Sequence, residues 1–220
     1  MFIKIENLLT DPEIQAVTEL ARRTKFIDGR QSNPHNTTKN NVIQDPADAS
    51  GRQASQIVLT AIQRSEEARN FVLPRRIAIP TFLSYREGMT YGTHVDAAFM
   101  NLGGQLLRSD VSATIFLSEP ESYEGGELTV HFGSETLRVK GRAGSAVFYP
   151  STTLHEVTPV TSGERLVMIT FIESQIPDQL QRDLLYTLNE VRALEGLRMD
   201  WSNRMNLEYV IANLLRLWAR

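Results

Sequence analysis

The pattern of hydrophobic and polar positions changes twice along the chain. Thr10 opens the segment TDPEIQAVTELARRT, with Pro12 in the first turn and Glu13 three residues after the threonine. A threonine followed three residues later by glutamate is a capping box, and the apolar positions behind it repeat at helical spacing. This predicts an amphipathic helix that ends near Arg23. A polar segment rich in Pro, Gly and Asn follows it and is predicted to be a long loop or an irregular extended segment. A second helix is predicted over roughly 52–70.

From residue 77 to residue 173 the chain changes to short runs rich in Val, Ile, Thr, Phe and Tyr, separated by turn residues. The clearest runs are SATIFLS, GELTVHF, ETLRVKG, SAVFYP and RLVMITFIES. Several short strands with turn signals at this spacing predict an antiparallel sandwich, jelly roll or barrel. After Pro177 helical spacing returns in DQLQRDLLYTLNEVRAL and in MNLEYVIANLLRLWAR.

We therefore expect a mainly β protein with flanking helices. Residues 1–76 are expected to form an N-terminal helical and loop segment packed on the core, residues 77–175 the β core, and residues 176–220 a C-terminal helical extension. A chain of 220 residues is long enough for one well-filled domain and somewhat short for two independent cores.

Composition narrows the classes of function. A formal charge of -3 offers no general attraction to nucleic acid or anionic membranes. The absence of cysteine excludes disulfides, thiolate zinc sites and cysteine nucleophiles. The first residues hold too short an apolar stretch for a signal peptide, and no apolar run approaches membrane-spanning length. We expect a cytoplasmic protein without a nucleic-acid or membrane partner.

The stretch YGTHVDAAFM places His94 and Asp96 two positions apart. In a β-strand such side chains point to the same face, so the pair can converge on one metal ion. A chain with 4 histidines and 26 acidic residues also produces such a pair by chance. A mononuclear site needs another ligand, and two histidines with one carboxylate and open positions is the pattern of non-haem iron(II) oxygenases.

Three other histidines are candidates for the further ligand. His155 opens a strand-like stretch late in the β region, where a jelly roll can bring it opposite an early strand. His35 lies in the polar loop, and strand alternation can turn His131 toward solvent. We therefore expect neither His35 nor His131 to be a ligand.

Arg165 lies ten residues after His155. Iron(II) with three protein ligands keeps three octahedral positions open, which a 2-oxo acid and oxygen can fill. If that acid is 2-oxoglutarate, its far carboxylate needs a buried cation. Arginine suits this because its planar fork binds a carboxylate bidentately and stays charged when desolvated. The alternative is a surface arginine after a Ser-Gly-Glu turn.

Taken together, three strings resemble the PKHD-type hydroxylases, bacterial relatives of prolyl and lysyl hydroxylases that depend on Fe(II) and 2-oxoglutarate. The strings are YREGMTYGTHVDAAF, RSDVSATIFLSEPESYEGGELTV and GSAVFYPSTTLHEVTPVTSGER. The resemblance covers nearly the whole chain, including an early KNN and the closing NLLRLWAR. It implies a double-stranded β-helix (jelly-roll) core with His94, Asp96 and His155 on iron and Arg165 on 2-oxoglutarate.

The resemblance also implies that Tyr85 and Tyr91 lie around the cosubstrate or substrate, although core packing is an equal alternative for two strand tyrosines. O2 is the second cosubstrate that it implies, with ascorbate as a reductant that keeps the iron ferrous. Ala97 departs from the family, whose members often have Asn after the Asp of the first motif. This departure puts the contact usually made there in doubt.

The expected function is hydroxylation of an unactivated C–H bond of an amino acid, peptide or related small metabolite, with release of succinate and CO2. Two alternatives remain open at this level: a non-catalytic metal-binding jelly-roll sensor or binding module, and a zinc hydrolase on the same three ligands. The residues do not identify the substrate, and we expect Ala97 and the segment 30–45 to influence it. The C-terminal helices offer a surface for homo-oligomer formation.

Overall fold

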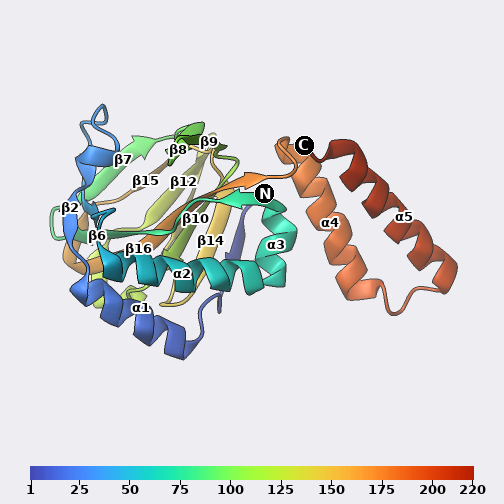
Figure 1. Ribbon diagram of the computed structural model, residues 1–220, viewed down its shortest axis with the longest axis horizontal. Coiled ribbons are helices and arrows are strands. Elements are labelled where there is room, and N and C mark those ends of the chain that lie inside the picture. The colour runs from blue at the N-terminus through green and yellow to red at the C-terminus, as the bar shows by residue number, and fades with distance from the viewer.

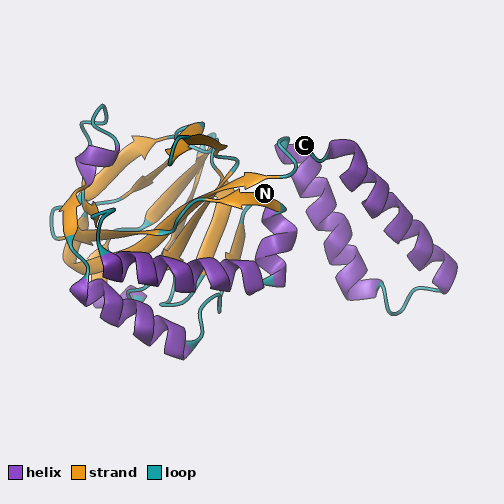
Figure 2. Ribbon diagram, in the orientation of Figure 1, coloured by secondary structure: helices purple, strands orange, loops and turns teal.

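The computed structural model describes all residues, 1–220. Figures 1 and 2 show two layers of strands, with helices along the outer side of the larger layer and a helical hairpin that stands apart from this body. The prediction of a mainly β core with flanking helices is therefore confirmed. The helices are α1 (Asp11–Arg23), α2 (Ala49–Arg64), α3 (Glu66–Val72), α4 (Gln179–Glu195) and α5 (Trp201–Trp218), with short 3-10 turns η1 (Gly29–Ser32) and η2 (Pro120–Ser122).

The strands form two main sheets and one separate hairpin. They are β1 (Ile3–Ile5), β2 (Phe26–Asp28), β3 (Lys39–Asn40), β4 (Val42–Gln44), β5 (Pro74–Ile77), β6 (Thr81–Arg86), β7 (Thr90–His94), β8 (Phe99–Leu102), β9 (Gln105–Arg108), β10 (Val111–Phe116), β11 (Tyr123–Gly125), β12 (Leu128–Phe132), β13 (Glu135–Val139), β14 (Ala146–Pro150), β15 (His155–Val157) and β16 (Val160–Ser174). The larger sheet has the order β1-β14-β10-β16-β6-β4-β2, with β5 and β11 also paired to β16. The smaller sheet has the order β13-β12-β15-β7-β3, and β8 pairs only with β9.

The first helix begins where the capping box predicts. Both the backbone N–H and the hydroxyl of Thr10 donate to Glu13 Oε2, at 2.8 and 2.9 Å, and the same carboxylate is paired with Arg64 of α2. The prediction of a single helix over roughly 52–70 is wrong in one respect, because the helix is interrupted at Ser65. The Ser65 hydroxyl accepts a hydrogen bond from Ala68 N at 3.2 Å and so starts α3 as a separate helix.

The polar segment after α1 is predicted as a long loop or an irregular extended segment, and it is extended over three short strands that the sequence pattern does not identify. It contains β2, η1, β3 and β4, and β2 pairs with β4. β3 and β4 pair with β7 and β6, two strands from the β region of the chain. Their pairing partners lie about 40 to 50 residues away, and in so short a strand the local hydrophobic pattern carries little signal. The segment therefore adds an edge to both main sheets.

The side chains of β10, an interior strand of the larger sheet, alternate between two environments. β10 is buried on both faces, with Val111, Ala113 and Ile115 in the apolar cluster beneath the helices. Ser112 and Thr114 point the other way, into the space between the sheets. A second apolar cluster, which includes Val130 and Val167, fills much of this space. The remaining volume between the sheets holds the polar side chains described below.

The C-terminal hairpin of α4 and α5 extends away from the sheets (Figure 1). Its two ends lie together, because the backbone N–H of Arg220 donates to the carbonyl oxygen of Gln175 at 2.8 Å. Buried Arg182 holds the start of α4 through hydrogen bonds to the carbonyl oxygens of Ile176 and Pro177, at 2.8 and 2.7 Å. None of the helices has both the length and the apolar character needed to span a membrane.

Candidate functional site

Two neighbouring strands of the smaller sheet bring three predicted ligands together. His94 ends β7 and His155 begins β15, and the two residues are partners in the antiparallel register. Asp96 follows His94 by two positions, with its Oδ1 4.0 Å from His94 Nε2 and its Oδ2 3.7 Å from His155 Nε2. One ligand atom from each of the three residues lies within 4.8 Å of the others. Two imidazoles and one carboxylate in this arrangement suit a non-haem Fe(II) ion with open positions.

Both imidazoles are held in the form that binds metal. His94 Nδ1 lies 2.8 Å from the carbonyl oxygen of Gly92, and His155 Nδ1 lies 2.9 Å from that of Thr153. A carbonyl oxygen only accepts, so Nδ1 carries the proton in each ring and Nε2 is left with a free lone pair. Burial, followed by the neighbouring His155, lowers the pKa of His94 to about 4, so this ring is neutral at physiological pH.

The carboxylate of Asp96 is oriented by a chain of buried serines. Ser112 Oγ donates to Asp96 Oδ2 at 2.5 Å, and it lies 2.7 Å from Ser151 Oγ. Ser109 Oγ donates in turn to Ser151 Oγ at 2.8 Å. These hydroxyls come from the start of β10 and from the two turns beside it. They leave Asp96 Oδ1 free of hydrogen bonds from the chain.

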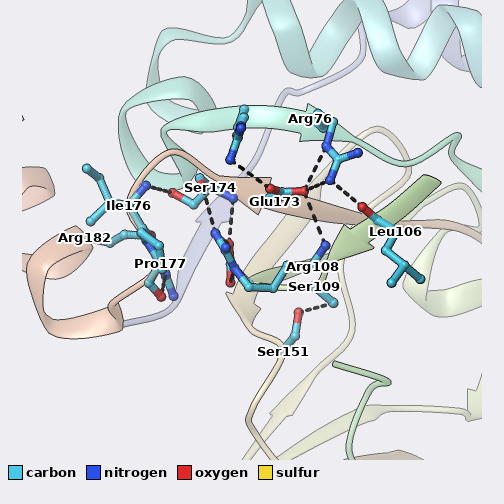
Figure 3. A network of polar contacts seen from close by, with 12 residues as sticks. Arg76, Leu106, Arg108, Ser109, Ser151, Glu173, Ser174, Ile176, Pro177 and Arg182 are labelled. Atoms are coloured by element: carbon cyan, nitrogen blue, oxygen red, sulfur yellow. Dashed lines mark hydrogen bonds and ion pairs between the residues drawn. The ribbon is translucent and has the colours of Figure 1, made fainter. Parts of the chain in front are cut away.

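The serine chain starts from a network of ion pairs at the end of β16, drawn in Figure 3. Glu173 is buried there between Arg76 and Arg75, and Arg108 pairs with Asp110 at 2.7 Å. Arg108 also donates to the carbonyl oxygen of Ser174 at 3.1 Å. Because these charges are paired and hydrogen-bonded, they fix the backbone on either side of Ser109. The network therefore connects the base of the C-terminal hairpin to the serines that hold Asp96.

Arg165 is buried in the interior, contrary to the alternative of a surface arginine. It lies on β16 directly opposite Tyr85 of β6, and only 2% of its surface is exposed. Its guanidinium carbon is 5.1 Å from the ring centroid of Tyr85 and 5.9 Å from that of Phe116. Its Nε has no hydrogen-bond partner, and no carboxylate lies within 4.0 Å of the group. A buried guanidinium without an anion is the cradle that a carboxylate ligand would fill.

The two predicted tyrosines take different positions. Tyr85 is buried against Arg165, and burial raises the pKa of its phenol to about 12, so the group stays protonated and can donate a hydrogen bond. Tyr91 stacks on the ring of His94, with centroids 3.6 Å apart and planes 15° apart. Its hydroxyl accepts a hydrogen bond from Asn33 Nδ2 at 2.9 Å. Tyr91 therefore packs on the ring of His94, whereas Tyr85 lies at the Arg165 guanidinium.

The other two histidine candidates are outside the cluster. His35 is exposed in the connection between η1 and β3. His131 follows Val130, the register partner of His155, and so points to the opposite face of the smaller sheet. Its Nε2 lies 3.9 Å from Glu156 Oε1.

One cavity of about 450 Å³ contains the whole arrangement, a size typical of small-molecule sites. The three candidate ligands, Arg165 and both tyrosines line it, as does Ala97, whose methyl group provides no polar contact. Sequence reasoning missed Lys39, Ser112 and Tyr149, which also line it. For Ser112 a signal was present, because VSATIF alternates apolar residues with small polar ones, as expected for a strand with one face toward a polar site.

Comparisons with known proteins agree with this geometry. The sequence profile of the 2OG-Fe(II) oxygenase superfamily matches residues 80–173. A PKHD-type hydroxylase of Sphingopyxis alaskensis is 48% identical over 217 residues, which cover 99% of each chain. The relatives at this level of similarity thus match the C-terminal hairpin as well as the core.

Solved structures share the fold at low identity. A Pseudomonas putida prolyl-4-hydroxylase has a TM-score of 0.53 and 22% identity, covering 79% of this chain and 92% of its own. A Trichoplax adhaerens prolyl hydroxylase, solved with a peptide fragment of a hypoxia-inducible factor oxygen degradation domain, has a TM-score of 0.57 and 16% identity. It covers 78% of this chain and 83% of its own. The strand pattern leaves a sandwich, a jelly roll or a barrel open, and the jelly-roll core that the resemblance implies is therefore confirmed.

Proposed function

Because the chain belongs to the PKHD-type hydroxylases, which are Fe(II)- and 2-oxoglutarate-dependent dioxygenases, we propose that His94, Asp96 and His155 hold the iron and that Arg165 binds 2-oxoglutarate. The enzyme hydroxylates a C–H bond with consumption of O2 and release of succinate and CO2. The observation that carries the residue assignment is the pairing, in one cavity, of three converging ligand atoms with a buried guanidinium that has no anion.

The donor set fits ferrous iron and does not favour the zinc-hydrolase alternative. Two neutral imidazoles and one carboxylate leave the ion with a net positive charge, which favours capture of a dianionic oxo acid. A zinc hydrolase needs a general base beside the metal-bound water. Asp96 is the only carboxylate that lines the cavity, so no second acidic group is available as the general base.

In the proposed mechanism, the bound iron supplies the oxidising chemistry together with 2-oxoglutarate and O2. The chain's own contribution is to bind and orient the iron, 2-oxoglutarate and the substrate, and to exclude water. Arg165 fixes the far carboxylate of 2-oxoglutarate, and the Tyr85 phenol donates a hydrogen bond beside it. Ser112 orients Asp96, while Tyr91 keeps the His94 ring in place by stacking. We propose no side-chain acid or base, because none is needed when hydroxylation occurs at a C–H bond.

The substrate is a small molecule or a peptide. The Trichoplax enzyme was solved with a peptide fragment, which supports a peptide as one of the two substrate classes. The cavity has apolar residues at its rim, including Val95 and Phe99, which are 50% and 59% exposed. We also propose a division of the chain, in which residues 77–175 form the catalytic core and residues 1–76 pack on it and complete the cavity wall. The proposed reductant is ascorbate, which keeps the iron ferrous.

For the extension 176–220 we propose a contact between copies of the chain. Its support is the number of large apolar side chains left uncovered on the α4–α5 hairpin, among them Leu197, Trp201 and Leu217, which are 89, 71 and 74% exposed. Light scattering of the full chain tests this. A monomer at micromolar concentration would contradict it.

The experiment that tests the proposed function uses purified protein loaded anaerobically with Fe(II) and 2-oxoglutarate. We expect a visible charge-transfer band on binding and slow succinate formation once O2 is admitted, even without a prime substrate. The matched control is the His155→Ala variant, which should show neither signal. Parent protein that binds iron but gives no band and no succinate would contradict the assignment.

A further inference from the structure

One ammonium group that lines the same cavity belongs neither to the three proposed iron ligands nor to the proposed 2-oxoglutarate site. Lys39 lies on β3, directly opposite Tyr91 of β7 in the antiparallel register, and such partners point to the same face. Its side chain therefore turns inward, and only 7% of the residue is exposed. The ammonium nitrogen lies 4.8 Å from the centroid of the Tyr91 ring and donates to Ser32 Oγ at 2.6 Å.

The charge of Lys39 is not neutralised by the chain. No carboxylate lies within 4.0 Å of the ammonium group, and a serine hydroxyl is a neutral acceptor. Lysine is among the residues least often buried without a charged partner, because removing an ammonium ion from water is costly. Burial lowers the pKa of Lys39 to about 8, and the attraction of Asp96 offsets only part of this effect.

The cofactors do not neutralise it either. Fe(II), Arg165 and Lys39 together bring four positive charges to the cavity. Asp96, the only carboxylate in the lining, and the 2-oxoglutarate dianion bring three negative charges. Asp96 also shares its charge with the metal once the metal is bound. One positive charge is therefore left for the remaining occupant of the cavity, which is the substrate.

We propose that Lys39, together with the hydroxyl of Ser32, binds a carboxylate of the prime substrate, and that an apolar group accompanies this carboxylate. The inference rests on the proposed function, because it takes Arg165 as the site of 2-oxoglutarate. The apolar part is supported by the rim of the cavity, where Ile79, Val95 and Phe99 are 63, 50 and 59% exposed. The substrate is thus an apolar carboxylic acid, either a free acid or the C-terminal residue of a peptide.

The test uses matched pairs of acid and amide, because the amide keeps the shape and loses the charge. The probes are N-acetyl-L-leucine and its primary amide, and a five-residue peptide that ends in leucine as the free acid and as the amide. Binding is measured by ligand-observed NMR to full-length protein loaded with Zn(II) and saturating 2-oxoglutarate, which does not turn over. We expect at least one acid to bind about tenfold or more tightly than its amide, as a hydrogen bond to a charged group predicts.

Two variants assign the preference to Lys39. Lys39→Met keeps the length and apolar stem of the side chain, and in it the acid and the amide should bind within about twofold of each other. Lys39→Arg keeps the charge and should retain most of the preference. Lys25→Met, which removes a lysine on the exposed surface, should behave like the parent. The probe pair that shows the preference for acid over amide, either the leucine derivative or the peptide, identifies the source of the carboxylate.

The inference is overturned if acids and amides bind alike to the parent, including no binding of either at millimolar concentration. It is also overturned if Lys39→Met keeps the preference for the acid. Failure of the proposed function is separate, because it would appear as loss of 2-oxoglutarate binding in the parent itself. Normal 2-oxoglutarate affinity in the parent and in Lys39→Met, without any preference for acids, removes only the carboxylate subsite.

Discussion

Ser112 donates a 2.5 Å hydrogen bond to Asp96 Oδ2 across the space between the two main sheets. Ser112 is on β10, an interior strand of the larger sheet, whereas Asp96 follows the end of β7 in the smaller one. The bond occupies Oδ2, the oxygen nearer His155, and leaves Oδ1, the oxygen nearer His94, without a hydrogen bond from the chain. It also ties the candidate metal centre to the ion-pair network of Figure 3 through Ser151 and Ser109.

We expect Ser112→Ala to weaken Fe(II) binding by about 10- to 100-fold, the usual effect of losing a group that orients a ligand. Anaerobic calorimetry with Fe(II) measures this directly, before any turnover. Ser162→Ala, at an exposed position of β16, is the control and should match the parent. Unchanged iron affinity in the Ser112 variant would show that Asp96 needs no such support.

The choice among histidines can be decided by two alanine variants on adjacent strands. His155→Ala should abolish turnover and lower iron affinity strongly, because it removes one of the three proposed ligands. His131→Ala should bind iron within about twofold of the parent, since its side chain faces the other side of the sheet. The reverse result, with iron lost in the His131 variant and retained in the other, would refute the assignment. Iron content after dialysis and succinate formation are the two measurements.

Replacement of Arg165 should separate binding of the oxo acid from binding of the metal. Arg165→Ala removes a charge-assisted pair, so the affinity for 2-oxoglutarate should fall by roughly 10- to 100-fold or more while iron still binds. Arg165→Lys should recover part of the loss, because it keeps the charge without the fork. Arg138→Ala, at an exposed position of β13, is the control. Anaerobic titration of 2-oxoglutarate reports the affinities, and equal values in all variants would contradict the role given to Arg165.

Lys39 should make the ligand-free protein less stable at neutral pH. Its pKa falls from 10.5 in the unfolded chain to about 8 in the fold, where burial is the main cause. Between these values the unfolded chain holds the proton more often than the folded one, so stability rises with pH through this window. The free energy of unfolding of Lys39→Met should therefore exceed that of the parent by about 1 to 3 kcal/mol at pH 7.

The difference in unfolding free energy between Lys39→Met and the parent should become smaller as the pH rises from 8 toward 10. In this range the ammonium group of Lys39 loses its proton, so the folded parent no longer contains a buried, destabilising charge. Urea unfolding of both proteins at pH 7 and pH 9.5 measures the two free energies, and the comparison cancels other titrating groups. A difference that stays constant with pH would mean that the ammonium group is not desolvated as the structure indicates.

Local pattern determined the parts of this protein that depend on neighbours in sequence. The capping box of Thr10 and Glu13 marks the start of α1, since its hydrogen bonds span only three residues. The pairing of His94 with Asp96 follows from the two-residue period of a strand. The same reasoning failed at Ser65, where a serine within a helical pattern ends one helix and caps the next.

Tertiary structure decided everything that joins distant segments. His155 meets His94 only through the register of β15 with β7, and a slip of one residue would turn it to the opposite face. Lys39 comes from a segment whose polar composition predicts a loop or an irregular extended segment, yet its pairing with β7 places it in the cavity. The physical reason is the same in each case. The identity of a side chain is given at its own position in the sequence. Its contacts and its burial depend on strands that pair across 50 or more residues of chain.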